Sequence, residues 1–410
     1  MKIHFIGIGG IGVSALAQYH LLSGDAVSGS DPSDSELIQK MKEMGATIFN
    51  SNSKDNIKDY DLVVYSPAVK DTNPELVCAR EKGIKTLSYP QALGELSKKH
   101  FTIAISGTHG KSTTTAMTSL ILIEAGFDPT VIIGTKLKEF GNSNFRMGSS
   151  KYLIIEACEY EASFLNYHPE IGVILNIEAD HLDYYKNIEN IKEAFNKFAS
   201  QSNLVIKEKD LNLNTDKKTI EVSKIEGLEV NVPGEHNKID ASFALTIARE
   251  LGIDDDFSFK AISKFSGTWR RFDEHVLNNI VIIDDYAHHP TEILTTLKGI
   301  REKYSDKKIY CFFQPHQYQR TSLLLEDFIK SFKEVVKIVD SFFIIDIYDV
   351  LGREDSSLKI SSEEIAKMVD GLNYIKKEDV AEKIKGGEVI IFMGAGDIYD
   401  LSCDIRKSIL

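Results

Sequence analysis

The sequence predicts an α/β protein of three domains, each built on a mainly parallel sheet. Short apolar strands alternate with helical stretches along the chain, which is typical of parallel α/β sheets. Glycine-rich turns follow two of the strands, and polar clusters follow several others. The length of 410 residues, of which 42% are hydrophobic, is enough for two to three domains that each bury a core.

The first unit begins with a strand, a glycine turn and a helix. We expect a strand at Lys2–Ile6 and a helix at Ile11–Leu22, with GIGGIG (residues 7–12) between them. This sequence matches GxGxxG, and Asp31 follows 19 residues after Gly12, about where a dinucleotide fold places its ribose-binding acid. A tight turn beside an unrelated surface aspartate is the alternative, but the complete context favours a nucleotide diphosphate site. NAD, FAD and a UDP-sugar all carry such a diphosphate.

A further strand and a polar segment complete the first unit. We expect a strand at Leu62–Tyr65, which ends in Ser66 and Pro67. The polar residues 97–100 separate this unit from the next motif. The first domain boundary is therefore placed after residue 97.

The second unit contains the most informative stretch of the chain, SGTHGKST at residues 106–113. It lies between an expected strand, Phe101–Ile105, and an expected helix, Thr114–Ile123. A glycine-rich turn in this place directs backbone N–H groups at phosphate oxygens. Lys111 would then neutralise the β- and γ-phosphates, and Ser112 would offer an oxygen to Mg²⁺. Ile105 stands where a full Walker A motif has its first glycine, so an ordinary strand-to-helix connection is the alternative.

Acidic residues follow another strand of this unit. Glu156 comes directly after the expected strand Tyr152–Ile155. It therefore points into the crevice where α/β sheets bind ligands, and it is a candidate ligand of Mg²⁺. We expect the next acids, Glu159 and Glu161, to belong to a solvated turn.

The segment NIEADHLD (176–183) follows the expected strand Ile171–Leu175 in the same way. A histidine between acids, here His181, indicates metal ligation or proton transfer. A helix start with capping acids would explain Asp180 but leaves His181 unexplained. The pattern of residues 203–232 is too weak to assign.

The third unit begins at the junction GTWRRFD (267–273). Its two arginines suit phosphate oxygens because planar guanidinium groups form paired hydrogen bonds, although such a pair can also be solvated. Pro290, within DDYAHHPTE (284–292), suits the first turn of a helix, but the acids, tyrosine and histidines before it are more polar than a cap requires. The expected strands of this unit are Ile280–Ile283, Ile309–Phe313, Phe342–Ile347 and Val389–Met393.

The composition limits the class of protein. A formal net charge of −13 argues against a general nucleic-acid binder. The four cysteines are far apart, which indicates reduced thiols and not a disulfide framework, and no His/Cys cluster has zinc spacing. No apolar run is long enough to span a bilayer, and the glycine-interrupted N-terminus does not read as a signal peptide. We expect a cytoplasmic enzyme that binds neither nucleic acids nor membranes.

The chain thus has two separate candidate phosphate-binding loops. An oxidoreductase needs only the first loop, whereas an ATP-driven enzyme that acts on a nucleotide-linked substrate needs both. The second class of enzyme is therefore favoured.

Eight blocks of the sequence, taken in order, resemble the Mur ligase family. They are GIGGIG (7–12), GTHGKST (107–113), EACEYEASFL (156–165), NIEADHLD (176–183), PGEHN (233–237), GTWRRFD (267–273), DDYAHHPTE (284–292) and FQPHQYQRT (313–321). Within the family they are most similar to the members that join L-alanine to UDP-N-acetylmuramate. The resemblance implies a Rossmann-like UDP-sugar-binding domain at 1–97, a central phosphate-loop ATPase domain at 98–266, and a Rossmann-like domain for the amino acid and ADP at 267–410.

The resemblance also implies a reaction in peptidoglycan precursor synthesis, with ATP and Mg²⁺. The lactyl carboxylate of UDP-N-acetylmuramate attacks the γ-phosphate and becomes an acyl phosphate. The amine of L-alanine then attacks its carbonyl, and a tetrahedral intermediate expels phosphate. Phosphoryl transfer demands mainly positioning and charge neutralisation, which suits Lys111 and Mg²⁺. A monomer or a homodimer is expected.

The resemblance further assigns roles to individual residues. The expected catalytic residues are Lys111, Glu156, His181 and Arg271, and the expected metal-proximal residues are Ser112, Glu156 and His181. ATP is expected to contact Gly107, Thr108, His109, Gly110, Lys111, Ser112 and Thr113, with Asn237 at the adenine, Asp285 at the ribose and Arg271 at the phosphates. UDP is expected to contact Gly9, Gly10, Gly12 and Asp31, with Ser66 nearby, and the amino acid is expected to face Tyr286, His288 and Arg320. Because the ATP ligands come from two domains, domain closure is expected to assemble the site.

Some positions depart from the family pattern, and other functions stay open. Gln317 stands where many relatives have arginine, which leaves Arg320 as the only guanidinium of its motif. Asp240 replaces an expected asparagine, and the stretch between His181 and Pro233 looks short for the family. The nearest alternative is a murein-peptide ligase that attaches a preformed tripeptide. An NAD-dependent oxidoreductase and a non-catalytic nucleotide sensor are alternatives of other classes.

Overall fold

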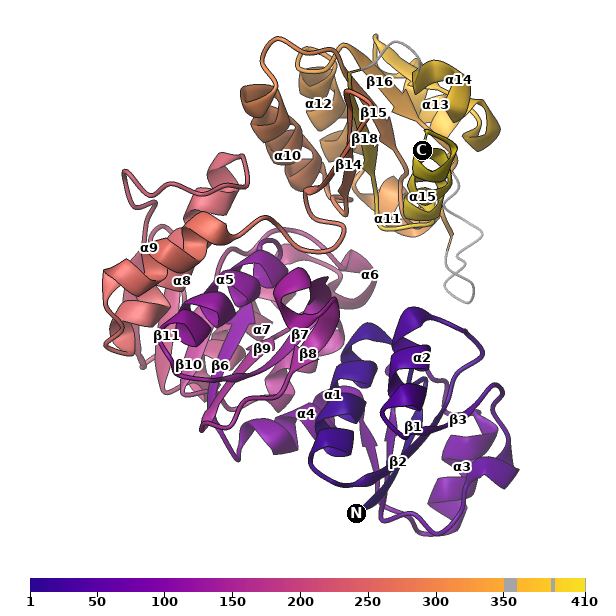
Figure 1. Cartoon of the computed structure of the whole chain (residues 1–410), viewed down its shortest axis with the longest axis vertical. Coiled ribbons are helices and arrows are strands. Elements are labelled where there is room, and N and C mark those ends of the chain that lie inside the picture. Colours follow the sequence, from indigo (N-terminus) through magenta and orange to yellow (C-terminus); the bar gives the residue numbers. More distant parts are fainter. Residues whose placement is uncertain (350–359, 385–387, 410) are drawn as a thin grey trace. The chain divides into compact units, whose positions relative to one another are not determined.

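A computed structural model describes residues 1–349, 360–384 and 388–409 of the chain (Figure 1). These residues form two compact units, each described here by itself. Unit 1 comprises residues 1–178, 189–223 and 242–261, and unit 2 comprises residues 179–188, 224–241 and the chain from residue 262 onward.

Unit 1 contains two sheets, and the first is a five-stranded parallel sheet with the order β3-β2-β1-β4-β5. The strand order reverses beside β1, and ligands of open α/β sheets bind at such a switch point. The GIGGIG loop follows β1, so it lies at this point. The strands are β1 (Lys2–Ile6), β2 (Ala26–Ser30), β3 (Thr47–Phe49), β4 (Leu62–Tyr65) and β5 (Thr86–Ser88), and the helices are α1 (Ile11–Leu22), α2 (Glu36–Glu43), α3 (Pro74–Glu81) and α4 (Tyr89–Ser97).

The middle of helix α1 is buried on all sides. Residues 13–18 are all buried, including the polar Ser14 and Gln18. A helix that is buried all round must be covered on more than one side. The first sheet covers one side, and strands β7 and β8 of the second sheet also contact α1.

The second sheet of unit 1 has seven strands in the order β12-β11-β10-β6-β9-β7-β8. All neighbouring pairs are parallel except β7 with β8. Its central strands are apolar on both faces, as expected for a covered parallel sheet. The strands are β6 (Phe101–Ser106), β7 (Thr130–Leu137), β8 (Ser143–Arg146), β9 (Tyr152–Glu156), β10 (Ile171–Ile174), β11 (Leu204–Glu208) and β12 (Lys218–Val222), and the main helices are α5 (Lys111–Glu124) and α7 (Ile188–Gln201).

Unit 2 is built on a six-stranded sheet with the order β13-β14-β18-β15-β16-β17. Only the edge pair of β13 with β14 is antiparallel among the described strands. The rings of Phe312, Phe343 and Phe392 stack in its core. The strands are β13 (Asp273–Leu277), β14 (Ile280–Asp285), β15 (Ile309–Phe313), β16 (Ser341–Ile344), β17 (Leu372–Tyr374) and β18 (Val389–Met393).

Several helices of unit 2 lie around its sheet. Around the sheet are α10 (Pro290–Lys303), α11 (Tyr318–Leu323), α12 (Leu325–Val335), α13 (Ser362–Lys367), α14 (Val380–Lys383) and α15 (Ile398–Ile409). The short α6 (Leu182–Tyr185) contacts α11. The remaining helices are α8 (Glu235–Glu250) and α9 (Asp255–Lys264).

The predicted α/β fold with three mainly parallel sheets is confirmed, with differences at the ends of elements. Helix α5 begins at Lys111, three residues before its predicted start, because the loop turns directly into the helix. Strand β14 continues through Asp285, so Asp284 and Asp285 belong to the strand and do not follow it. Strand β16 ends at Ile344, and the weakly patterned residues 203–232 contain β11 and β12.

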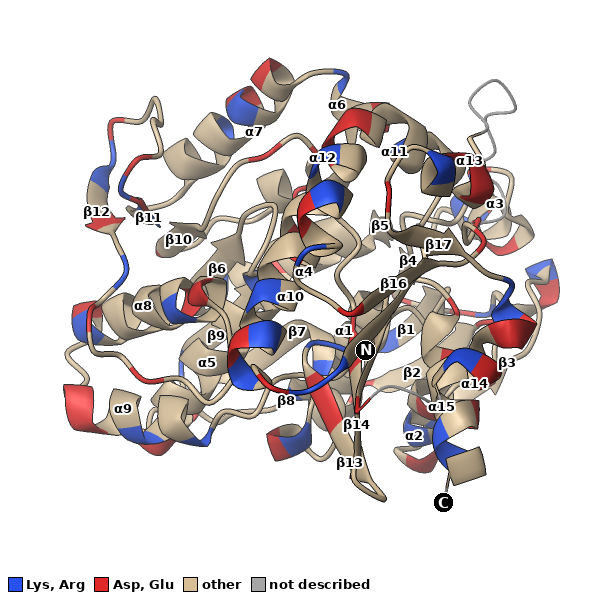
Figure 2. Cartoon of the chain, turned by 90° about the horizontal axis from the view of Figure 1, so that it is seen from above, with Lys and Arg blue, Asp and Glu red and all other residues tan. Residues whose placement is uncertain are grey.

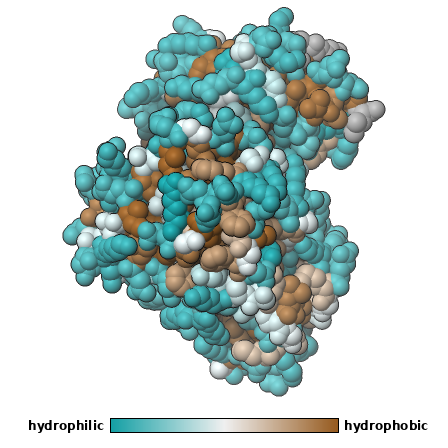
Figure 3. All heavy atoms as spheres, turned by 60° about the vertical axis from the view of Figure 1, so that its left-hand side comes forward, coloured by the Kyte–Doolittle hydropathy of each residue, from teal (hydrophilic) through white to brown (hydrophobic). Residues whose placement is uncertain are grey.

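The surface is mostly polar. Figure 2 shows acidic and basic residues interspersed along the outer helices, and Figure 3 shows hydrophilic atoms around smaller apolar areas. Exposed pairs such as Lys197 with Glu193 contribute little to stability because water screens them. In the described part of the chain, no helix is both long and apolar enough to cross a membrane.

Candidate active site

The loop from residue 107 to residue 110 joins β6 to α5 and has the backbone shape of an anion-binding turn. Gly107 and Gly110 have φ angles of +146° and +83°, which side chains with a Cβ rarely adopt. Within the described residues, no side chain caps the first turn of α5, and that turn contains no acid. The N–H groups of that turn therefore point out of the helix at its positive end, where an anion is stabilised.

The segment after β10 holds this loop in place. Asn176 accepts a hydrogen bond from the His109 N–H at 2.8 Å, and its amide donates to the His109 carbonyl at 3.1 Å. Thr108 accepts at Oγ1 from the Glu178 N–H at 2.8 Å. The motif of residues 176–183 drew attention through His181 and its neighbouring acids, and the role of Asn176 in fixing the loop was not predicted.

Ser112 and Glu156, both predicted to lie near a metal ion, lie together at the start of α5, although Glu156 is the last residue of β9 and does not follow the strand as predicted. The Ser112 hydroxyl donates to the Glu156 carboxylate at 2.9 Å. The N–H of Gly134, on β7, donates to the same carboxylate oxygen at 2.8 Å. A Cβ at Gly134 would lie 2.8 Å from that oxygen, so the approach requires glycine. A hydroxyl and a carboxylate side by side form the oxygen donor set that Mg²⁺ prefers.

Lys111 has an unexpected partner. Its ammonium lies 2.9 Å from the carboxylate of Glu159, and it donates to the carbonyls of Gly107 and Thr108 at 2.6 and 3.0 Å. Glu159 is only 3% exposed, so its prediction as part of a solvated turn is wrong, whereas Glu161 is exposed as predicted. Burial alone would lower the pKa of Lys111, but the charge of Glu159 raises it above its ordinary value. The lysine therefore stays charged beside the loop.

The GIGGIG loop and Asp31 are in contact. The Gly9 N–H donates to the Asp31 carboxylate at 2.9 Å, which places this acid at the loop as its spacing predicted. A Cβ at Gly12 would lie 2.6 Å from the ring of Tyr89, and a Cβ at Gly7 would lie 3.1 Å from the Cβ of Ser66. Ser66 therefore lies beside the loop, and the close approach of Tyr89 was not predicted.

Asp285, the last residue of β14, holds two nearby backbone segments by hydrogen bonds. Its two oxygens accept hydrogen bonds from the N–H groups of Phe272 and Ala287, both at 2.9 Å. Burial raises the pKa of Asp285 to about 6, although these two bonds oppose the shift. The carboxylate therefore ties residue 272 of the junction to the segment that carries Tyr286.

The two arginines of the junction have different surroundings. Arg270 donates to the carbonyls of Gly394 and Gly396, both at 2.9 Å, and its guanidinium lies 5.1 Å from the centre of the Tyr399 ring. The guanidinium of Arg271 lies 5.5 Å from the Tyr286 ring. Arg270 thus anchors the junction to the segment after β18, and Arg271 remains the candidate for a phosphate contact.

Arg320, the predicted contact for an amino acid, pairs with an acid in this structure. Its guanidinium donates to the Asp180 carboxylate at 3.2 and 3.3 Å. Burial alone would raise the pKa of Asp180, but the charge of Arg320 holds it well below its usual range. His181 follows directly, with φ +52°, and its N–H donates to the same carboxylate at 2.7 Å.

His288 and Tyr286 lie next to each other. Their ring centroids are 5.4 Å apart, and Nδ1 of His288 is 3.0 Å from the Tyr286 carbonyl. Burial, and then the positive charge of Arg320, lower the pKa of His288 to about 4. The imidazole is therefore neutral near pH 7.

The predicted residues divide between the two units. Unit 1 contains Gly9, Gly10, Gly12, Asp31, Ser66, residues 107–113 and Glu156, and unit 2 contains His181, Asn237, Arg271, Asp285, Tyr286, His288 and Arg320. Asn237 is buried in the first turn of α8, where its amide donates to the Pro233 carbonyl at 2.7 Å. The metal role of His181 and the ATP roles of Asn237, Arg271 and Asp285 remain predictions.

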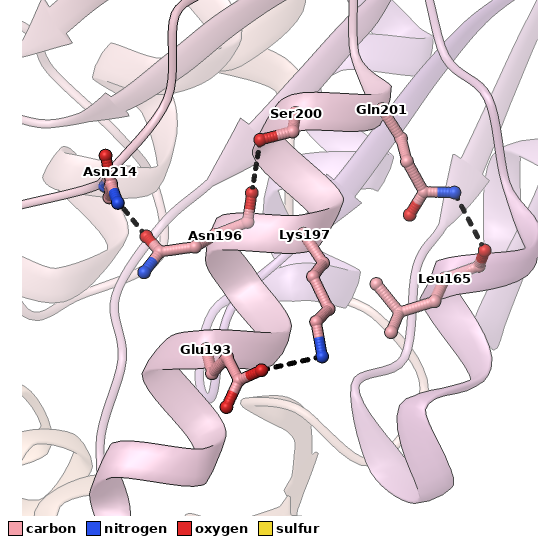
Figure 4. A pocket seen from close by; sticks show the side chains of 7 residues that line it. All are labelled: Leu165, Glu193, Asn196, Lys197, Ser200, Gln201 and Asn214. Atoms are coloured by element: carbon pink, nitrogen blue, oxygen red, sulfur yellow. Dashed lines mark hydrogen bonds and ion pairs between the residues drawn. The ribbon is translucent and has the colours of Figure 1, made fainter.

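One open pocket lies elsewhere in unit 1, along helix α7 (Figure 4). An ion pair between Lys197 and Glu193 and hydrogen bonds of Asn196 occupy its polar groups. No predicted site residue lines it. Its lining residues are Leu165, Glu193, Asn196, Lys197, Ser200, Gln201 and Asn214.

Three family models match the chain in order. They are described as "Mur ligase family, catalytic domain" at residues 2–101, "Mur ligase middle domain" at residues 105–218, and "Mur ligase, glutamate ligase domain" at residues 270–396. Together the three models cover more than half of the chain.

Curated relatives match over almost the full length of both sequences. The chain is 40% identical to a UDP-N-acetylmuramate--L-alanine ligase of Clostridium novyi, and the match covers 97% of this chain and 95% of the relative. It is 41% identical to an enzyme of the same name from Clostridium acetobutylicum, with coverage of 98% and 96%.

Solved structures match as well. The crystal structure of UDP-N-acetylmuramate-alanine ligase MurC from Thermotoga maritima has a TM-score of 0.82 at 30% identity, over 100% of this chain and 99% of that one. A murein peptide ligase from Psychrobacter arcticus has a TM-score of 0.70 at 22% identity, over 100% and 98%, and this likeness shows the fold alone.

Proposed function

The chain belongs to the Mur ligase family, and from this premise we propose that it is an ATP-dependent ligase in peptidoglycan precursor synthesis. It joins L-alanine to the lactyl carboxylate of UDP-N-acetylmuramate. The observation that carries this function is the full-length similarity to enzymes that bear this name, at about 40% identity over 97% of the chain. The two loops support it, because this reaction needs a nucleotide-linked substrate and ATP.

The chemistry of the proposed reaction has two steps. The carboxylate is a poor electrophile, so one of its oxygens attacks the γ-phosphorus of ATP, and ADP leaves. The amine of L-alanine then attacks the acyl carbonyl, the C–O bond to the phosphoryl group breaks, and phosphate leaves while the amine loses a proton. The enzyme must mainly position the reactants and neutralise charge.

The loop of residues 107–113 is the proposed triphosphate site. The uncapped N-terminus of α5 offers N–H groups to phosphate oxygens, and Lys111 provides a buried positive charge next to them. Glu159 holds that charge in this structure, so we propose that a triphosphate draws the ammonium away from it. Asn176 keeps the loop backbone in the required shape.

Ser112 and Glu156 are the proposed holders of Mg²⁺. Their oxygens are 2.9 Å apart, and Gly134 orients the carboxylate. A bound Mg²⁺ would neutralise charge on the phosphate oxygens. Glu156 in turn fixes the Ser112 hydroxyl at the first turn of α5.

The remaining roles follow from the resemblance and from each residue's surroundings. We propose that Gly9, Gly10, Gly12 and Asp31 hold UDP, with Ser66 nearby, and that Tyr286, His288 and Arg320 face the amino acid. For Arg320, the carboxylate of Asp180 marks where the carboxylate of L-alanine would bind, because both are planar anions that suit a guanidinium. A cytoplasmic location and a monomeric or homodimeric state remain predictions.

An isotope experiment tests the acyl-phosphate step. UDP-N-acetylmuramate with ¹⁸O in the lactyl carboxylate is incubated with the enzyme, ATP, Mg²⁺ and L-alanine, and the products are analysed by mass spectrometry. We expect the mass of the alanyl amide and one ¹⁸O in the released phosphate. Amide formation without ¹⁸O in phosphate would exclude the acyl phosphate, and absence of the amide would exclude the ligation.

A further inference from the structure

A residue of the second sheet of unit 1 contacts the first turn of α1, the helix that follows GIGGIG. Asn144, on β8, donates through its amide to the Ser14 hydroxyl at 2.9 Å and to the carbonyl of Ile11. Ile11 and Ser14 lie in the first four residues of α1. The start of the helix is therefore held by a side chain of the sheet that also carries the phosphate loop.

A second amide on α1 completes this contact. Gln18 lies one turn after Ser14, and its amide donates to the Asn144 side-chain oxygen at 2.9 Å. The Ser143 hydroxyl donates to the Gln18 side-chain oxygen at 3.1 Å. Asn144 and Ser14 are 0% exposed, Ser143 is 1% exposed and Gln18 is 2% exposed. We call these four residues the amide cluster.

Because its four residues are buried, the amide cluster tolerates little change in the positions of its hydrogen-bonding groups. A buried amide that loses its hydrogen-bond partner is strongly unfavourable. Both side-chain amides of the cluster use their oxygen and their nitrogen. The cluster therefore permits one relative position of α1 and β8 and disfavours neighbouring ones.

Strand pairing continues this contact to the proposed triphosphate site. Phe145, next to Asn144, is paired with Ile132 on β7. Gly134, two residues further along β7, donates to Glu156, and Glu156 accepts from Ser112. A short path through the pairing of β8 with β7 and the two hydrogen bonds of the Glu156 carboxylate thus joins the amide cluster to the start of α5.

We propose that Asn144 and Gln18 are positioning residues for the ligation, because they fix the diphosphate-binding turn relative to the phosphate loop. This inference rests on the proposed function, in which the carboxylate of one substrate must meet the γ-phosphate of the other. Neither side chain touches the reactants in this account. A displacement of about 1 Å in such an alignment can cost about 100-fold in rate.

The test compares Asn144→Ala with Asn56→Ala, a matched control. Asn56 is also a buried asparagine of unit 1, and its amide donates to the Ser51 carbonyl at 2.8 Å and to Glu75 at 2.5 Å. Each variant therefore removes a buried amide whose nitrogen donates two hydrogen bonds, and Asn144→Ala also removes the bond that Gln18 donates. The measurements are the thermal midpoint, the Kd of a non-hydrolysable ATP analogue and of UDP-N-acetylmuramate, and kcat with all substrates saturating.

We expect Asn144→Ala to lower kcat at least 10-fold while the Kd of the ATP analogue changes less than 3-fold. Asn56→Ala should lower the thermal midpoint to a similar extent but keep kcat within 2-fold of the unmodified enzyme. An equal kcat for the two variants would overturn the proposal, because the cluster would then act only on stability. If Asn144→Ala does not fold, Gln18→Met, which keeps the volume and removes the amide, is held to the same criteria.

The unmodified enzyme separates failure of this inference from failure of the proposed function. If it shows no ligation with ATP, UDP-N-acetylmuramate and L-alanine, the proposed function is wrong and the inference falls with it. If it ligates and Asn144→Ala ligates as fast, the function stands and the inference alone is wrong.

Discussion

The ammonium of Lys111 lies 2.9 Å from the carboxylate of Glu159, and both side chains are nearly buried. The lysine that is proposed to neutralise a triphosphate is thus already paired within the protein. A buried ammonium without an anion would be unfavourable, so Glu159 keeps the charge in place. Two predictions follow from the residues of this pair.

Lys111→Ala should abolish ATP-dependent ligation, with a loss on the order of 1,000-fold or more, because the triphosphate loses its nearest positive charge. Binding of UDP-N-acetylmuramate should remain, since the GIGGIG loop belongs to the other sheet of unit 1. Titration calorimetry with the UDP-sugar and an ADP-release assay measure the two effects. A folded variant that loses both UDP-sugar binding and ADP release would contradict the proposal that the two substrates bind at separate sites.

Glu159→Gln should lower the free energy of unfolding by about 1–3 kcal/mol, because the buried ammonium of Lys111 loses its counter-charge. Glu161→Gln is the matched control, since it makes the same chemical change at an exposed position two residues away. Its effect should stay within about 0.5 kcal/mol. Urea unfolding measures both variants, and equal stability of the two would show that the ion pair does not stabilise the fold.

Arg270→Ala and Arg271→Ala should separate stability from activity. Loss of Arg270 removes two hydrogen bonds and a ring contact with Tyr399, so the free energy of unfolding should fall by about 2–3 kcal/mol. Arg271→Ala should cost less than about 1 kcal/mol but lower kcat/KM for ATP on the order of 100-fold, if Arg271 contacts phosphate. Thermal unfolding and steady-state kinetics check this, and the reverse assignment of effects would count against it.

His288 should make stability depend on pH. Its pKa is about 4 in the folded protein, whereas an exposed histidine has a pKa of about 6.5. As the pH falls below about 6.5, the unfolded chain takes up a proton that the folded protein does not, so stability is lost until about pH 4. The loss from this group should reach about 2 kcal/mol at pH 5.

The variant His288→Asn tests that pH dependence, because it removes the titrating group. The free energy of unfolding should fall less between pH 7.5 and pH 5 in the variant than in the unmodified protein. The same fall in both proteins would mean that His288 protonates normally when folded.

The sequence was most informative where glycine and hydrophobic spacing constrain the backbone. The strands before both loops and the helix Ile11–Leu22 lie within one residue of their predicted bounds, since each has a strong local signal. Ser112 and Glu156 were both predicted to lie near Mg²⁺, and their contact agrees with the pairing of β6 with β9, whose carboxyl ends meet at one edge of a parallel sheet.

Contacts between segments that are far apart in the chain could not be predicted from the sequence. Glu159 lies in an acidic stretch that is polar enough for a surface turn, and only the fold brings it to Lys111. Asn176 and the close approach of Tyr89 to Gly12 likewise depend on segments far apart in the chain. The sequence around Asn144 matches no motif, and its partners Ser14 and Gln18 are about 130 residues away in the chain.

The acceptor specificity gives the most direct test of the central claim, because a murein-peptide ligase would share this fold and use the same UDP-sugar. ADP release is measured with ATP, Mg²⁺, UDP-N-acetylmuramate and one acceptor at a time: L-alanine, glycine, L-serine or the preformed tripeptide. Glycine and serine are included because one methyl or hydroxyl group changes selectivity by only about 1–3 kcal/mol in a small pocket. We predict the highest kcat/KM with L-alanine and no turnover with the tripeptide. Turnover with the tripeptide alone would contradict the account.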